Sequence, residues 1–213
     1  VGMERSILPS IAEQEFAIAA KSAVLSFIVV FGVTKACTNY LAGRLSDRFG
    51  RKHVLVAGWI VAVPVPFLLM WAPSWTWVLV ANAFLGVSQG LTWSTTVSMK
   101  IDLAGPEKRG LAMGLNEFAG YFAVAASALA TGLIAARYGL RPEPFYLGVV
   151  YVAVGLLLSA LVVRDTSHHV AAEAKLRVAT PAGEALPPRE GVTRTTAWDR
   201  TLLTCSPAAP RHQ

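Results

Sequence analysis

Charge is what this sequence most lacks. Only 15% of its 213 residues are charged, against about a quarter in a typical soluble domain. The deficit is concentrated, because residues 53–99 contain no Asp, Glu, Lys or Arg, and neither do residues 144–163. A chain with 54% hydrophobic residues and a mean hydropathy of +0.49 has too little polar surface for a soluble domain of this size. We therefore predict an integral membrane protein.

Cysteine and recognisable metal-binding patterns are also scarce. Cys37 lies in an apolar run and Cys205 in the polar C-terminal part, which excludes a disulfide framework. The neighbouring His168 and His169 have no Cys or carboxylate at ligand spacing. We expect no metal site and no cofactor. Residues 1–21 lack the apolar core of a cleavable signal peptide, so we expect none.

The apolar runs are long enough to cross a bilayer, which takes about 20 residues of helix. They predict an all-α membrane protein, a bundle of transmembrane helices. The five predicted spans are residues 22–43, 54–72, 76–99, 111–136 and 144–163. Residues 1–21 are then expected to form an extracytoplasmic segment. Residues 165–213 lack any apolar period and are expected to form a disordered cytoplasmic tail.

Lys and Arg in the short loops predict the orientation, because cytoplasmic loops are enriched in them. The side that holds loops 44–53 and 100–110 and the start of the tail carries eight basic residues, and the opposite side carries four. We therefore expect the 43–53 loop in the cytoplasm, most simply in a bacterial cytoplasmic membrane. This clustering also explains the net charge of +6 without a nucleic-acid partner. The expected partners are the lipid bilayer and an unknown small solute, with a coupling ion left open.

The loop between the first two spans reads Gly-Arg-Leu-Ser-Asp-Arg-Phe-Gly-Arg-Lys at residues 43–52. It resembles motif A of the major facilitator superfamily, and every fixed position of that motif is met. Residues 102–110 resemble the family's cytoplasmic loop between helices four and five, and residues 163–166 its exit from helix six. The likeness covers about residues 5–170, which corresponds to helices two to six of twelve. The resemblance implies a secondary transporter that moves a small solute by alternating access, present here as a fragment.

In that family the motif loop acts as a latch between the two halves of the transporter, formed in one state and broken in another. Carboxylate and guanidinium groups suit this role because they pair through charge-assisted hydrogen bonds. The alternative is that the basic residues only anchor the loop on the cytoplasmic side. The candidate latch residues are Gly43, Asp47, Arg48, Gly50, Arg51, Lys52, Asp102 and Arg109.

The third span carries a polar stripe along one face of its predicted helix. Asn82, Gln89, Trp93 and Thr96 fall within a narrow arc, because their spacings of seven, four and three match the helical repeat. Lipid penalises exposed amides, so the stripe should face protein or water. We expect it to line the substrate cavity, as helix four does in the family. Hydrogen bonding between helices, without substrate contact, is the alternative.

Two positions depart from the family's proton-coupled antiporters. Asn82 stands where many such members have an Arg early in helix four. Gly120 is followed by Tyr121, where many antiporters have Gly-Pro in helix five. These positions do not support drug–proton antiport.

Lys35 and Glu117 are the only formal charges deep within a predicted span. A charge near the bilayer centre costs roughly 2.5–3.5 kcal/mol on insertion scales, which favours a paired or functional role. Both lie about 10–12 Å from the cytoplasmic end at 1.5 Å per residue, so they could pair with each other. Snorkelling of the Lys35 side chain to the surface is the alternative.

We do not expect an enzyme. Gly86 to Gly90 matches the Gly-x-Ser-x-Gly pattern of hydrolases, but that pattern needs a sharp strand-to-helix turn to expose Ser88, and here it lies inside an apolar helical run. A second class of function remains open beside transport, namely a non-transporting half-bundle that associates with other membrane subunits.

Overall fold

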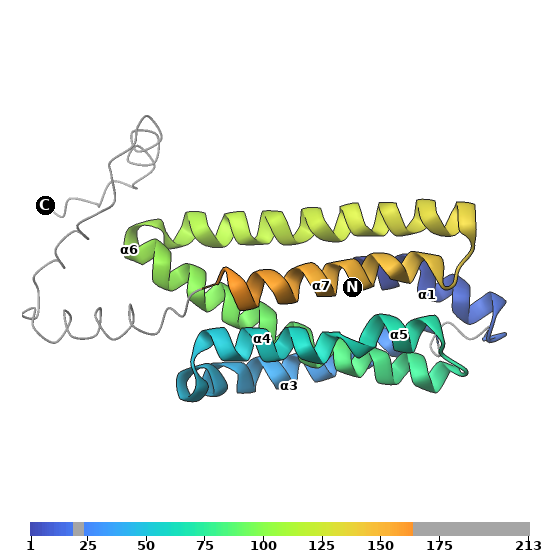
Figure 1. Ribbon diagram of the computed structural model, residues 1–213, viewed down its shortest axis with the longest axis horizontal. Coiled ribbons are helices and arrows are strands. Elements are labelled where there is room, and N and C mark those ends of the chain that lie inside the picture. The colour runs from blue at the N-terminus through green and yellow to red at the C-terminus, as the bar shows by residue number, and fades with distance from the viewer. Residues whose placement is uncertain (19–23, 164–213) are drawn as a thin grey trace, which may run out of the picture. The chain divides into compact units, whose positions relative to one another are not determined.

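The computed structural model describes residues 1–18 and 24–163, except the side chains of residues 105–107. Its helices are α1 (Gly2–Gln14), α3 (Ser26–Phe49), α4 (Arg51–Ala62), α5 (Pro64–Met70), α6 (Trp75–Tyr138) and α7 (Glu143–Leu161) (Figure 1). The described residues contain no strand, so the predicted all-α fold class is confirmed. The predicted tail, His168, His169 and Cys205 lie outside the described residues.

Gly50 makes the turn between α3 and α4 possible. Its φ of 84° and ψ of 148° lie where a side chain on the α-carbon is rarely accommodated. Its amide N–H also closes α3 by donating to the carbonyl of Ser46 at 3.0 Å. The fixed glycine of the motif therefore has a backbone role at the point where the chain reverses.

The second predicted span is divided by its prolines. Pro64 has no amide hydrogen to donate, so the helix is interrupted at Val63 and resumes as α5. Val63 instead donates its amide to the carbonyl of Ile60 at 3.1 Å. Together α4 and α5 still provide an apolar length sufficient for one crossing.

α6 contains two predicted spans. Figure 1 shows its ribbon reversing direction, so that a first arm (residues 75–104) and a second arm (residues 108–138) run back along the bundle. Helical structure continues through residues 100–110, where a loop was expected, which corrects that detail of the prediction. Three helical stretches of the described chain are long and apolar enough to cross a membrane: Arg51–Met70, Lys108–Tyr138 and Glu143–Leu161. Membrane crossing by α3 and by the first arm of α6 stays a prediction.

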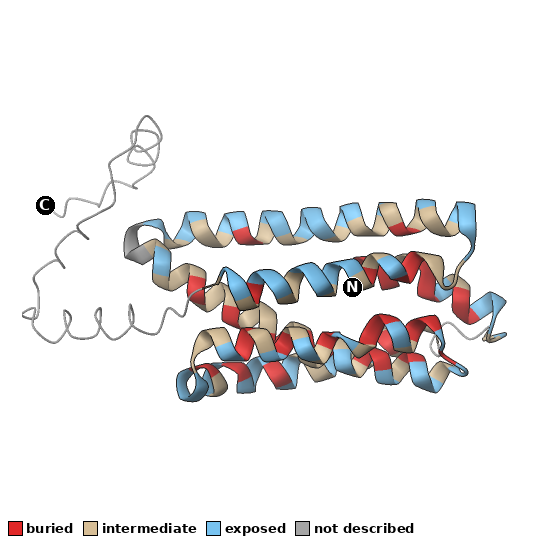
Figure 2. Ribbon diagram, in the orientation of Figure 1, coloured by how far each residue is buried: buried red, intermediate tan, exposed pale blue. Residues whose placement is uncertain are grey.

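The main apolar core lies where α1 meets the rest of the bundle. Ile7, Leu8 and Ile11 of α1 are each at most 2% exposed, and they pack in one cluster with Phe145 of α7. In Figure 2 the buried residues gather along α1, α5 and the lower helices, whereas the second arm of α6 is largely exposed. This packed helix was not predicted from the sequence, where residues 1–21 were expected to form only an extracytoplasmic segment. The side of the membrane on which the segment lies stays a prediction.

Glycines let α3 approach the first arm of α6 closely. A side chain at Gly90 would meet Thr38 at 2.6 Å and the carbonyl of Lys35 at 3.1 Å. A side chain at Gly86 would come within 2.8 Å of the carbonyl of Phe31. Small residues at such a seam bring two helix backbones together and maximise dispersion contacts, as in other membrane bundles. This seam fixes the register that places Lys35 opposite the polar stripe.

Candidate functional site

The motif segment (residues 43–52) comprises the end of α3, the turn at Gly50 and the start of α4, so most of the loop predicted here is helical. An ion pair ties this segment to α6. The guanidinium of Arg51, at the start of α4, pairs with the carboxylate of Asp102 on α6. The two side chains are only 15% and 13% exposed, which limits screening of the pair by water. Ser46 and Thr95 lie 3.3 Å apart, hydroxyl to hydroxyl, and join α3 to the same arm. Two of the predicted latch residues, Arg51 and Asp102, are thus brought together within this bundle.

The remaining latch residues are placed differently. Gly43, Asp47 and Arg48 are exposed or partly exposed at the end of α3, and a side chain added at Gly43 would meet no atom of the described chain within 4 Å. Lys52 and Arg109 are partly buried. The motif therefore has one part engaged inside the bundle and another on its surface, and its action as a latch between two halves stays a prediction.

Lys35 of α3 meets the polar stripe of α6. Its ammonium donates a hydrogen bond to the side-chain carbonyl of Gln89 at 2.8 Å. It also lies 5.7 Å from the ring centroid of Trp93 and 5.7 Å from that of Phe31. Ring faces attract a cation by about 0.5–2 kcal/mol, depending on its desolvation. The deep charge and the stripe, predicted separately, form one cluster.

The other stripe residues have distinct surroundings. Asn82 is 1% exposed and donates its amide to the carbonyl of Val78 at 3.0 Å. Trp93 packs over Gly120 of the second arm, where an added side chain would meet its ring at 2.6 Å. Thr96 is partly buried. The stripe thus runs from a buried amide through the ring of Trp93 at the seam between the two arms of α6.

Glu117 does not form an ion pair with Lys35 in the described part of the chain. The side-chain amide of Asn116 donates to it at 3.4 Å, and Asn116 accepts a hydrogen bond from Lys100 at 2.6 Å. The Lys35 ammonium instead donates to Gln89, in place of the direct pair that equal depth along the two helices allowed.

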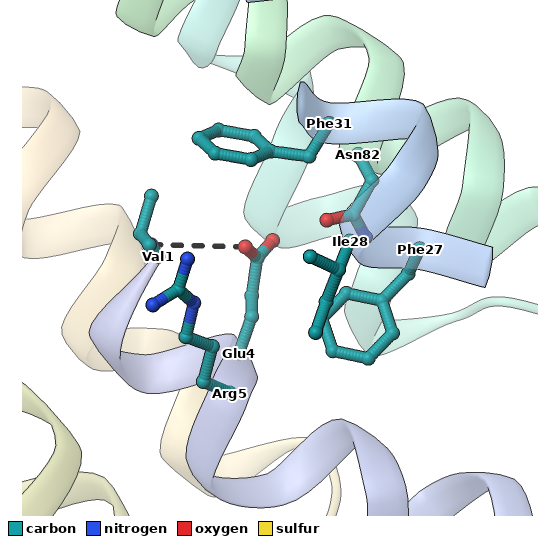
Figure 3. Close-up of a pocket in the computed structure, with 7 residues that line it drawn as sticks. All are labelled: Val1, Glu4, Arg5, Phe27, Ile28, Phe31 and Asn82. Carbon is teal, nitrogen blue, oxygen red and sulfur yellow. Dashed lines mark ion pairs between the residues drawn. The ribbon is translucent and has the colours of Figure 1, made fainter. Parts of the chain in front are cut away.

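A second polar group faces the bundle interior on α1. Figure 3 shows Glu4 with Arg5 of its own helix and with Val1, which precedes α1. Across the pocket lie Phe27, Ile28 and Phe31 of α3 and Asn82 of α6. These residues enclose a cavity of about 10 Å³. Glu4 was not among the residues predicted from the sequence, because this segment was expected to lie outside the bundle. The apolar residues at positions 3, 7, 8 and 11 form one helix face and were the available signal.

Ser88 has none of the geometry of a hydrolase nucleophile. It is 4% exposed in the interior of α6, and its carbonyl accepts a hydrogen bond from Thr92 at 2.9 Å. The sharp turn that would expose the hydroxyl is not present at this position.

The described chain is an apolar helical bundle with a partly buried ion pair at the motif segment. It also holds a half-buried cation among polar groups of its helices, as in a polytopic membrane protein. The chain belongs to the major facilitator superfamily, whose family pattern matches residues 2–206. The resemblance inferred from the motif loop is thereby confirmed.

Among curated proteins, the chain is similar to the proton-coupled antiporter flippase LtaA of Staphylococcus aureus, in strains USA300, NCTC 8325 / PS 47 and COL. The identity is 34% over 95 residues, which is 44% of this chain and 23% of the relative. The matched part therefore spans about a quarter of the length of these relatives. No solved structure gives a significant match.

Proposed function

We propose that this chain supplies one helix bundle of a secondary transporter that moves a small solute by alternating access. The observation that carries the proposal is the cluster in which Gln89 and Trp93 of α6 hold the Lys35 ammonium of α3. A buried or half-buried cation within a membrane bundle is costly, which makes it a marker of a substrate or ion pathway. The solute would bind against Lys35, Gln89, Trp93 and Thr96. A second bundle would cover this site and rock against the first to open it to one side of the membrane at a time.

Family membership and the Staphylococcus relative support two features of this proposal. The family pattern extends over nearly the whole chain, which favours transport over the alternative of a non-transporting half-bundle. The relative is described as a proton-coupled antiporter, which favours a proton as the coupling ion here. In this mechanism the Arg51–Asp102 pair would hold the motif loop in position, while Asp47 and Arg48 at the surface engage the second bundle in one state.

Solute-evoked proton movement tests the proposal even while the solute is unidentified. The complete reading frame that contains this chain would be reconstituted into liposomes loaded with a pH-sensitive dye and exposed to a panel of sugars, amino acids, carboxylates and lipid headgroups. We expect at least one solute to change the internal pH, and Lys35→Met to abolish that response. If no solute evokes proton movement or uptake, the half-bundle alternative replaces transport.

The proposed orientation places the 43–53 loop in the cytoplasm and the turn before α6 outside. In a Cys37→Ser, Cys205→Ser background, Phe49→Cys probes the first end and Ser74→Cys the second, since both positions are exposed. We expect an impermeant maleimide to label Ser74→Cys in intact cells, and Phe49→Cys only after permeabilisation. The reverse pattern would show that the bundle is inserted the other way round.

A further inference from the structure

Glu4 is a carboxylate with an unsatisfied oxygen in the bundle interior. The residue is 2% exposed, and one of its carboxylate oxygens is buried without a hydrogen-bond partner among the described residues. Its other oxygen lies 3.7 Å from the backbone nitrogen of Val1. A buried, unsatisfied charged oxygen carries a large desolvation penalty, which is relieved when the group takes up a proton.

The surroundings of Glu4 favour its protonated form, because they combine apolar walls with an amide that can accept a hydrogen bond. Phe27, Ile28 and Phe31 of α3 contribute apolar walls, and Figure 3 shows the Asn82 amide facing the same space. Because Asn82 donates its amide nitrogen to Val78, its oxygen remains to accept a hydrogen bond from a protonated carboxyl. The cavity of about 10 Å³ has room for a single water molecule at most.

The charges around the pocket favour a proton over a metal cation. The Arg5 guanidinium lies beside Glu4 on the same helix, and the residues that α3 and α6 present to the pocket do not titrate. The guanidinium would repel a sodium ion, and the small volume leaves no space for the other ligands of the ion. A proton neutralises the carboxylate in place and needs no additional volume.

We propose that Glu4 is a proton-binding residue of this bundle, exchanging its proton with solvent through the pocket that it shares with Asn82. The assignment of this proton as the coupling ion rests on the transport function proposed above. The binding of the proton itself does not, because it depends only on the burial and partners of Glu4.

Infrared spectroscopy of the purified 213-residue chain tests this assignment directly. A protonated carboxyl has a C=O stretch that is separate from that of carboxylate. Burial raises the pKa of Glu4, so we expect this band to titrate at a higher pH than that of an exposed glutamate. Glu4→Gln should remove the titrating band, while Glu13→Gln, at an exposed position on the same helix, should leave it unchanged. Transfer to D2O should shift the band, because an exchanging proton is replaced by deuterium, whereas a sealed structural carboxyl would not shift.

Glu4→Asp guards against a folding defect in Glu4→Gln, since it should keep a titrating band at a changed position. The proposal is overturned if the wild-type chain shows no titrating band, if the band persists in Glu4→Gln, or if it does not shift in D2O. A band that responds to NaCl but not to choline chloride would instead assign a metal-cation site. The two proposals can fail separately. If the Glu4 band titrates but no solute causes proton movement in the liposome assay, the transport proposal is refuted and proton binding by Glu4 is retained.

Discussion

Liposomes that contain only this 213-residue chain will show no solute uptake above that of empty liposomes. Alternating access requires two bundles that rock against each other around a site near the midplane. Here Lys35, Gln89 and Trp93 are only partly buried, so nothing in the described bundle closes the site from one side. The apolar stretch in the second arm of α6 is only 6% buried, which leaves it free to pack against further helices or lipid. We therefore expect a complete loss of transport rather than a reduced rate.

The measurement would use a solute identified by the proton-movement screen, at equal amounts of reconstituted protein. The complete reading frame is the positive control, and the Lys35→Met form of that protein is the matched negative control. Saturable, solute-dependent uptake by the short chain, abolished by Lys35→Met, would show that one bundle or an assembly of its copies transports without a second half.

The membrane class and the helical fold follow from the sequence because they depend on local composition. Uncharged runs of about 20 residues can satisfy their backbone groups in a bilayer only as helices, so α3, α4 with α5, both arms of α6 and α7 were all predictable. α1 was missed for the same reason. It has only 13 residues and carries charged side chains, so it falls short of the uncharged run of about 20 residues by which a membrane helix is predicted. The apolar residues along one of its faces are nevertheless buried in the bundle.

The members of the candidate site could be chosen from the sequence, but their pairing could not. Lys35 and the stripe of Gln89 and Trp93 stand out because polar groups are costly in an apolar run. Equal depth suggested Glu117 as the partner of Lys35, whereas the packing of α3 on Gly86 and Gly90 places Lys35 against Gln89. Helix register and rotation depend on such contacts between distant segments, which depth along a single helix does not report.

Within a complete transporter, Gln89→Ala and Trp93→Ala should weaken solute affinity far more than a truncation on the opposite face of α6. Gln89→Ala removes the group that positions the Lys35 ammonium, so a polar group of the desolvated solute complex is left unpaired. Such a group costs roughly 1–3 kcal/mol in the complex. That corresponds to about a 5- to 150-fold loss of affinity. Trp93→Ala removes the ring beside the ammonium, whereas Trp93→Phe should retain most of the affinity because a ring face remains.

Val80→Ala is the appropriate control for these variants, because Val80 is 39% exposed and lies opposite the stripe. Leu91 is unsuitable, since it is buried against Gly58 and its truncation would leave a cavity in the packing. A Lys35–Gln89 double-mutant cycle would separate coupling between the two residues from general weakening of the bundle. Half-saturating solute concentrations would be compared at matched protein amounts in the membrane, since a packing defect lowers the amount of protein rather than its affinity. If Gln89→Ala and Trp93→Ala both keep wild-type affinity, the stripe serves only to pack α6 against α3 and the solute binds against other residues.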